Sequence, residues 1–320
     1  MLGLERETYK KRPSNVLPME AKLVRKTTIK ESLKNFVKDM QAENLGQRTI
    51  AFHMENMAAM LKILEKQGII IKIPAKLTKD MIKQNLILYM VSKNYKPNTI
   101  NGRIKTLRKY ITFLSQEDYI ETNFASTLKK VRGKGEPIQA FTKDQVARLL
   151  EQPDRTTFTG FRDYTIFLLL LDTGIRLAEL CGLRIQDVDL KEGMIKVSGK
   201  GSSGHVPFSG RCAKILEKYL YYRDLRPNDS DHLFTSIHGT ALSRSTIQDQ
   251  FKKYGKKAKI VDVRVSPHTM RHTFAKYYIL GGGDAFSLQK ILRHKNMDTV
   301  KIYVNLWGGE VKKQHDKYSP

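Results

Sequence analysis

Hydrophobic residues recur at helical spacing through the first third of the chain. Apolar residues that would share one face of a first helix occur at Ile29, Leu33, Phe36, Val37 and Met40. Because they are three or four positions apart, they predict a helix that begins near Thr28 and ends at Gly46. The same spacing predicts further helices over residues 49–67, from Thr78 onward, and after Pro97. This part of the chain is therefore expected to be an all-helical domain.

The second half of the chain is predicted to be helical with one β-hairpin. Residues 194–197 and 205–208 are predicted to be strands, and the glycine-rich stretch 199–204 indicates the turn between them. Helices are expected over residues 161–171, 176–183, 210–223, 243–258, 266–280, 285–293 and 297–305. The fold class is therefore mainly α with a small β-hairpin or sheet, an α+β arrangement in the second domain.

Composition shifts along the chain indicate its domains. The stretch 129–137 is basic, contains two glycines and ends in proline, as linkers do. Thr142 then begins a new helix with residues that favour an N-cap. The predicted parts are a basic N-terminal arm over 1–27, a helical domain over 28–130, a linker over 131–140 and a second domain with a C-terminal tail over 141–320.

The positive charge of the chain indicates a polyanionic partner. The chain has 57 Lys and Arg against 32 Asp and Glu, which gives a net charge of +25, and both halves are basic. Such an excess repels itself in a compact protein, so DNA is the expected partner. Candidate DNA-binding residues are Lys96, Arg103, Lys105, Arg108 and Lys109 on the helix after Pro97, and Lys130, Arg132 and Lys134 in the linker. A purely solvated charged face is the alternative for these residues.

Several function classes are not supported by the sequence. The two cysteines, Cys181 and Cys212, form no C-x-x-C pair, which fits a reducing cytoplasm and no cysteine-rich metal site. No carboxylate cluster or H-E-x-x-H motif indicates a metal, and no cofactor is expected. No apolar run approaches the roughly 20 residues that span a bilayer, and the N-terminus is charged where a signal peptide is apolar. The protein is expected to be soluble and cytoplasmic, with no membrane partner.

The segment Ser266-Pro267-His268-Thr269-Met270-Arg271 predicts an anion site. Serine followed by proline is typical of a helix start. His268 and Arg271 are then three residues apart on one face of the first turn. The free N–H groups at the helix start also favour an anion, so an imidazole, a guanidinium and a helix end would converge on a phosphate. An ordinary capped surface helix is the alternative interpretation.

Three further segments carry candidate chemistry. In Thr173-Gly174-Ile175-Arg176-Leu177-Ala178-Glu179, the arginine and glutamate are also three residues apart, so the carboxylate would orient the guanidinium. Lys200 lies in the glycine-rich turn, but serine or threonine does not follow it, so the segment is not a P-loop. His294 is followed nine residues later by Tyr303 on a short predicted helix. Each segment alone also fits a structural role.

In this order the four segments resemble the tyrosine recombinase (phage integrase) family. Its pattern is an Arg in a T-G-x-R-x-x-E-L helix, a Lys on a β-hairpin, H-x-x-R, a second His or Trp, and a Tyr. The matching residues are Arg176, Lys200, His268, Arg271, His294 and Tyr303, with Glu179 at the acidic position. The match is close over residues 140–310, while residues 28–130 resemble the family's SAM-like core-binding domain in pattern only. Family members commonly have Leu-Gly-His where this chain has Leu292-Arg293-His294, so Arg293 is expected either to contact DNA or to loosen this turn.

The resemblance implies a mechanism without metal or ATP. Tyr303 would attack a DNA phosphate and form a 3′-phosphotyrosyl bond, with His268 as the base. Arg176, Arg271 and His294 would bind the non-bridging oxygens, Glu179 would orient the cluster, and Lys200 would protonate the leaving 5′ oxygen.

The resemblance also implies an assembly on DNA. Four protomers, identical or with a related recombinase, would hold two double-stranded DNA core sites in C-shaped clamps and exchange strands through a Holliday junction. The residues after Tyr303, including Trp307, would dock on a neighbouring protomer or pack locally.

Several roles stay open. A mobile-element integrase or resolvase is favoured, and chromosome or plasmid dimer resolution is the alternative. A type IB topoisomerase and a non-catalytic DNA-binding protein are less favoured, the latter because the full catalytic set is present. The sequence does not distinguish attack by Tyr303 on its own protomer's DNA from attack on a neighbour's.

Overall fold

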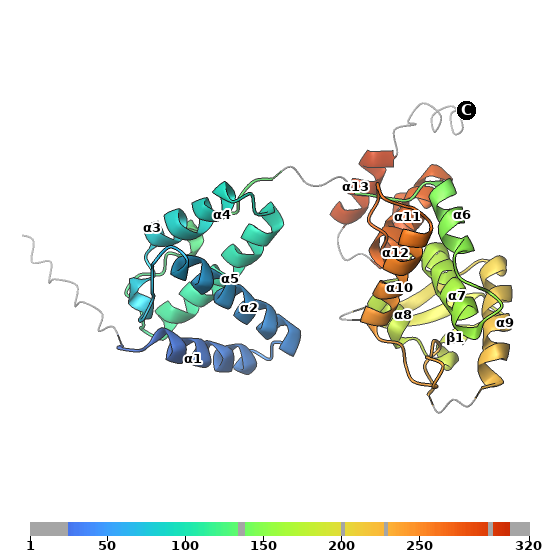
Figure 1. Cartoon of the computed structure of the whole chain (residues 1–320), viewed down its shortest axis with the longest axis horizontal. Coiled ribbons are helices and arrows are strands. Elements are labelled where there is room, and N and C mark those ends of the chain that lie inside the picture. The colour runs from blue at the N-terminus through green and yellow to red at the C-terminus, as the bar shows by residue number, and fades with distance from the viewer. Residues whose placement is uncertain (1–24, 134–137, 200–201, 227–229, 294–296, 308–320) are drawn as a thin grey trace, which may run out of the picture. The chain divides into compact units, whose positions relative to one another are not determined.

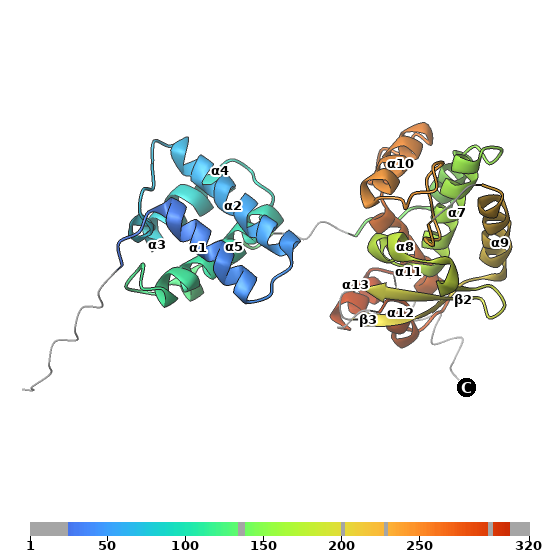
Figure 2. The same ribbon diagram turned by 90° about the horizontal axis from the view of Figure 1, so that it is seen from below.

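The computed structural model describes residues 25–133, 138–199, 202–226, 230–293 and 297–307. The chain divides into two compact units, Met1–Gly135 and Glu136–Pro320 (Figures 1 and 2). Most of the predicted N-terminal arm and part of the predicted linker lie outside the described residues. The last described residues of the first unit are anchored to it, because the side chain of Asn101 accepts a hydrogen bond from the N–H of Val131 at 2.8 Å.

The first unit is helical. Its helices are α1 (Ile29–Ala42), α2 (Gln47–Glu65), α3 (Lys79–Met81), α4 (Tyr89–Ser92) and α5 (Pro97–Gln116), with a π-helical segment, Ile82–Leu88, that joins α3 to α4. Thr28 and Thr78 cap α1 and α3, because each hydroxyl accepts a hydrogen bond from a backbone N–H of the first turn. Apolar faces of these helices meet in one core, in which Phe36 and Ile104 are fully buried.

The second unit packs helices around a small sheet. Its helices are α6 (Lys143–Glu151), α7 (Phe158–Thr173), α8 (Leu177–Gly182), α9 (Gly210–Asp224), α10 (Arg244–Lys257), α11 (Pro267–Leu280), α12 (Ala285–Leu292) and α13 (Asp298–Trp307). In its described part, three antiparallel strands form a sheet in the order β1 (Val188–Asp189), β2 (Met194–Gly199) and β3 (Ser202–Pro207). The mainly helical fold class with a small sheet is thus confirmed.

Helix α7 is the centre of the second unit. Apolar residues occur all around it, as expected of a helix that neighbours cover on every side, and α9 and α11 pack against it (Figure 2). The sheet joins this core through Ile195 and Val197, which are buried on one face of β2. Phe141 enters the same core, and its N–H donates to the Thr273 hydroxyl on α11 at 2.9 Å. These contacts fix α11, which carries two of the predicted site residues.

Two features of the sheet differ from the sequence-based prediction. The six-residue turn over 199–204 is wrong, because β2 extends to Gly199 and β3 begins at Ser202, with Val197 paired to Gly204. Glycine and serine carry the same backbone donors and acceptors as other residues, so they pair here despite their turn preference. Strand β1 was not predicted, since two residues are too few to show an alternating pattern.

Candidate active site

The ends of three helices meet in the second unit. The start of α8 carries Arg176, the start of α11 carries His268 and Arg271, and the end of α12 carries Arg293. Gly174 lets these elements approach one another. Its φ of +61° ends α7, and a Cβ there would lie 2.5 Å from Phe274 on α11 and 2.9 Å from Leu292 on α12. No side chain fits at this position.

Arg271 ties the loop before α8 to the end of α12. Its guanidinium donates to the carbonyl of Gly174 at 2.5 Å and to the carbonyl of Leu292 at 2.7 Å. Burial and the nearby charge of Arg176 lower the pKa of Arg271 to about 10, so it remains charged at neutral pH. A buried cation fixed in this way is a strong binding group for an anion.

Glu179 holds Arg176 from two sides. It accepts a hydrogen bond from the Arg176 backbone N–H at 2.7 Å and another from the guanidinium at 2.9 Å. Burial raises the pKa of Glu179, but the contacts from Arg293 and Arg176 outweigh it, so its pKa lies below the ordinary value. The carboxylate is 3% exposed whereas the Arg176 side chain is 42% exposed, so an oriented guanidinium faces solvent.

Tyr303 lies on α13 against α11. Its hydroxyl is 2.9 Å from Nδ1 of His272, and the residue is 1% exposed. Burial raises the pKa of Tyr303, while the charges of Arg271 and Arg176 lower it in part. The phenol is therefore neutral and lies within electrostatic reach of both arginines.

His272 is a site residue that the sequence analysis missed. It lies one turn after His268, and the two rings are 4.2 Å apart, edge to face. In the described residues it is His272, rather than His268, that contacts the Tyr303 hydroxyl. The four-residue spacing of the two histidines on one helix face was the available signal.

His268 is suited to accept a proton. Partial burial lowers its pKa, and the charges of Arg271 and Arg264 lower it further. The imidazole is therefore neutral at pH 7. Arg264 lies on the loop that leads into α11, so the positive charges near this imidazole come from both α11 and that loop.

Two predicted site residues lie outside the described part of the chain. These are Lys200, between β2 and β3, and His294, which follows α12. Their neighbours are described, and β3 packs against α12, where a Cβ on Gly204 would lie 3.4 Å from Cδ of Arg293. The hairpin thus adjoins the arginine cluster, which consists of Arg176, Arg271 and Arg293 around Glu179.

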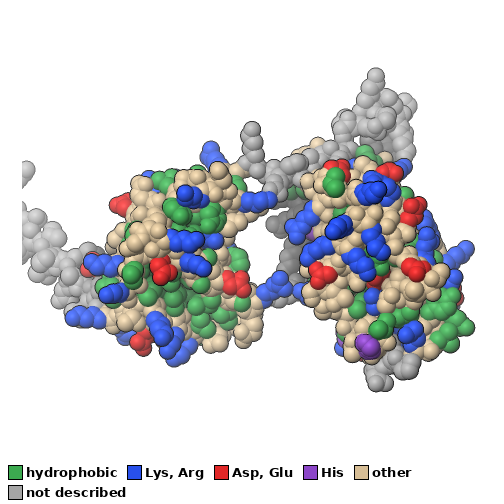
Figure 3. Space-filling model, viewed as in Figure 1, with side chains coloured by type: hydrophobic (Ala, Val, Ile, Leu, Met, Phe, Trp, Pro, Cys, Tyr) green, Lys and Arg blue, Asp and Glu red, His purple; other side chains and the backbone are tan. Residues whose placement is uncertain are grey.

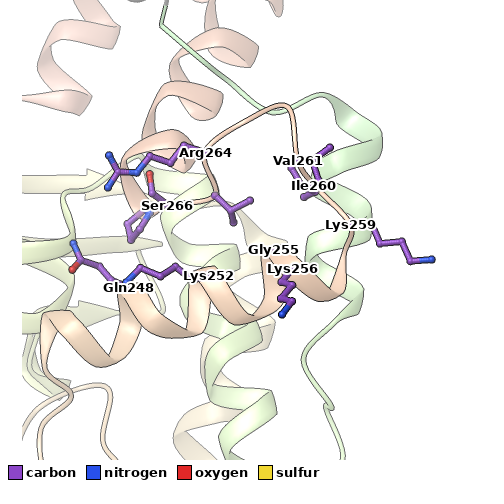
Figure 4. Close-up of a pocket in the computed structure, with 11 residues that line it drawn as sticks. Gln248, Lys252, Gly255, Lys256, Lys259, Ile260, Val261, Arg264 and Ser266 are labelled. Atoms are coloured by element: carbon purple, nitrogen blue, oxygen red, sulfur yellow. The ribbon is translucent and has the colours of Figure 1, made fainter. Parts of the chain in front are cut away.

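A basic cavity adjoins the start of α11. It has a volume of about 470 Å³ and lies between α10 and the loop before α11. In Figure 4, Gln248 and Lys252 on α10 extend toward Arg264 and Ser266, whereas Lys259 points away from them. These cations could not be predicted as a cluster from the sequence, because nothing in their spacing indicates that α10 and the loop before α11 face each other.

The predicted DNA-binding residues of the first unit fall into two groups. Three make contacts within the unit: Arg103 stacks on Tyr95, Arg108 donates to the Leu128 carbonyl, and Lys109 pairs with Glu43 at 2.6 Å. The side chains of the other described ones are exposed, namely Lys96, Lys105, Lys130 and Arg132. Lys134 lies outside the described residues.

Lys and Arg side chains outnumber Asp and Glu on the face of each unit that Figure 3 shows. Within the described ranges, no three His, Cys, Asp or Glu side chains group closely enough to bind a metal ion. No helix in the described part of the chain has the length and hydrophobicity needed to cross a membrane.

Known proteins are similar to this chain in sequence and fold. The model of the phage integrase family matches residues 139–307. The tyrosine recombinase XerC of Thermodesulfovibrio yellowstonii is 31% identical over 78% of this chain and 85% of its own length. The crystal structure of XerA recombinase is 30% identical, covers 91% of this chain and 99% of its own, and has a TM-score of 0.51.

A transposon integrase shares the fold at lower identity. The Tn1549 integrase, solved in complex with a circular intermediate DNA, is 21% identical with a TM-score of 0.67 and covers 85% of this chain and 94% of its own. The family match and the XerC relative together are decisive. The chain belongs to the phage integrase family and is a Xer-like tyrosine recombinase, an enzyme of site-specific DNA strand exchange.

Proposed function

We propose that Tyr303 is the nucleophile that cleaves DNA and that Arg176 and Arg271 bind the scissile phosphate. The observation that carries this proposal is the packing of α13 against α11, which places the Tyr303 hydroxyl 2.9 Å from Nδ1 of His272, the residue after Arg271. The charges of Arg271 and Arg176 lower the pKa of this buried phenol in part. Three side chains, from the N-cap of α8, from α11 and from α13, thus gather in one place. A structural role alone does not require a tyrosine beside two guanidiniums.

The phosphate would bind where the two arginines meet. Arg271 is fixed by two backbone carbonyls, and Arg176 is oriented by Glu179. Donors that are held in place before the reaction stabilise the charge that develops on the non-bridging oxygens. His294 would add a further hydrogen bond to the same oxygens.

The reaction exchanges one phosphoester bond for another. The Tyr303 oxygen bonds to phosphorus and loses its proton, while the bond to the 5′ oxygen breaks and that oxygen takes a proton from Lys200. A 3′-phosphotyrosyl bond forms, and its reversal by a new 5′ hydroxyl rejoins the strand without ATP. His268 is the proposed base, and His272 is the hydrogen-bond partner of the phenol.

The pH dependence of cleavage tests the role of His268. A base must be neutral, and a lowered pKa keeps His268 neutral to a lower pH. Arg271 and His272 on α11 and Arg264 on the preceding loop face this imidazole. The single-turnover cleavage rate should therefore stay level near pH 7 and fall roughly tenfold per unit only below a pKa that lies under 6.5.

Two substitutions control the pH experiment. His268→Gln should lower the cleavage rate near pH 7 and remove the decrease in rate at acid pH. His238→Gln, at an exposed loop position, should change neither. If His268→Gln kept the wild-type decrease at acid pH, another group would be the base.

DNA would be bound by both units. In the second unit the cavity between α10 and α11 places Lys252 and Arg264 beside the start of α11, where phosphates bind well. In the first unit Lys96 just before α5, Lys105 on α5, and Lys130 and Arg132 near the linker are exposed. We infer that residues 28–130 act as the core-binding domain, that residues 1–27 form a basic arm, and that the two domains clamp one duplex.

The proposed assembly is a tetramer on two duplexes, with the segment after Tyr303 docked on a neighbouring protomer. We favour integration, excision or resolution of a mobile element, and the transposon integrase with the same fold supports this role. Dimer resolution is the second candidate, supported by the XerC relative. Because both candidate roles act on DNA inside the cell, we expect the protein in the cytoplasm.

The decisive experiment maps the covalent bond. The protein is incubated with DNA nicked near a core site, the denaturation-resistant adduct is isolated, and its nucleotide-bearing peptide is identified by mass spectrometry. The expected peptide contains Tyr303. A wild-type protein that forms no adduct on its core site would be a binder only, and relaxation of any plasmid without joining of two sites would indicate a topoisomerase.

A further inference from the structure

Arg293 occupies a backbone position that favours glycine. It follows the last residue of α12 with φ 51° and ψ 50°, the left-handed conformation that side chains disfavour. The turn is nevertheless formed, because the Arg293 N–H donates to the Lys290 carbonyl at 3.1 Å. An arginine at this unfavourable backbone position indicates that its side chain makes an interaction that offsets the strain.

The Arg293 side chain turns into the arginine cluster. It is 9% exposed, and Nη2 lies 2.5 Å from Oε2 of Glu179, the oxygen that also accepts the Arg176 backbone N–H. The Arg293 carbonyl accepts from the Arg176 guanidinium at 3.4 Å. Arg293 therefore contacts Arg176 directly and through a shared carboxylate. The Arg293 side chain thus packs inward rather than facing solvent, and these contacts tie its turn to the start of α8.

The cluster carries more positive charge than its carboxylate neutralises. Arg176, Arg271 and Arg293 surround Glu179. The charges of Arg176, Glu179 and Arg293 each shift the pKa of Arg271. In the described part of the chain, Nε, Nη1 and Nη2 of Arg293 are buried without a hydrogen-bond partner, so the ion pair with Glu179 is the polar contact that holds this guanidinium. Three guanidiniums beside one carboxylate leave a net positive charge, which favours an anion at the exposed Arg176 guanidinium.

We infer that Arg293 is a positioning residue that, through Glu179, sets the orientation of Arg176 toward the scissile phosphate. The inference rests on the proposed function, because it assigns a residue to the same phosphate site. Arg293 links the turn before His294 to the start of α8, so the two sides of the site are coupled. Cleavage should therefore depend on Arg293 although its guanidinium does not touch DNA.

Arg293→Gly is the sharpest test, because glycine suits the turn better than arginine. Single-turnover cleavage should fall by about 10- to 100-fold, as small displacements of catalytic groups do, while the Kd for DNA stays within about twofold. Arg293→Asn, which also tolerates the left-handed turn, should behave alike. Arg293→Lys keeps the charge but not the planar guanidinium. Its cleavage rate should lie between those of the wild type and Arg293→Gly.

Two readouts separate positioning from a structural role. If Arg293 acts through Arg176, the double variant Arg176→Ala with Arg293→Gly should cleave no slower than Arg176→Ala alone. On DNA with a neutral methylphosphonate at the scissile position, less charge needs stabilising, so the Arg293→Gly defect should shrink. If the defects of Arg176→Ala and Arg293→Gly were additive, and the Arg293→Gly defect were equally large on both substrates, the inference would be overturned.

The outcomes also separate this inference from the proposed function. If the wild type forms the Tyr303 adduct and Arg293→Gly cleaves within twofold of it, only the inference is wrong. If the wild type forms no adduct, the proposed function itself has failed.

Discussion

Tyr303→Phe should abolish the covalent protein–DNA adduct while DNA binding persists. Phenylalanine retains the ring that fills the core between α11 and α13 but has no oxygen to bond to phosphorus. Loss of a nucleophile lowers catalysis by at least about 10³-fold. Denaturing gels with nicked DNA measure the adduct, and a mobility shift measures the binding.

The same substitution has a small predicted effect on stability. It removes the hydrogen bond to His272, which contributes about 1 kcal/mol, and leaves the buried ring contacts in place. The Tm should therefore fall by about 2–4 °C. Tyr278→Phe, in the same small core, is the matched control and should cleave like the wild type. An adduct that survived in Tyr303→Phe would mean that another residue attacks the phosphate.

Local features of this fold were readable from sequence. Thr28, Thr142 and Ser266 each begin a helix where predicted, because a cap depends on residues three positions away. Most predicted helix bounds agree with the structure within one to three residues, because helix ends are also set by residues close in sequence. The π-helical turn over Ile82–Leu88 was not predicted, since it differs from an α-helix by hydrogen-bond register and not by residue type.

Contacts between distant segments could not be predicted in this way. Arg271 is expected at a helix start, but its bonds to Gly174 and Leu292 span 97 and 21 residues of sequence. The choice of His272 as partner of Tyr303 depends on how α13 packs on α11, which no local pattern records. Arg293 is the clearest case, because a surface arginine and a buried one look alike in sequence.

Arg271→Lys should lose nearly as much cleavage as removal of the side chain. Lysine keeps one positive charge, but its ammonium cannot bridge the carbonyls of Gly174 and Leu292 and also face a phosphate. The burial and the neighbouring Arg176 charge that lower the pKa of Arg271 to about 10 would act on the ammonium too. A fall of about 10² to 10³ in single-turnover rate is expected, the usual effect of losing one fixed donor to a developing oxyanion.

Arg271→Lys should also destabilise the second unit, and this separates it from the other site variants. Each carbonyl left without a donor costs about 1–3 kcal/mol, so urea unfolding should show a lower midpoint. Arg176→Lys is the matched control. Its side chain is 42% exposed and is fixed by Glu179, so the substitution should impair cleavage with little loss of stability. If Arg271→Lys were as stable as the wild type, the two carbonyl bonds would not be what holds α8 and α12 together, and the phosphate site would need another support.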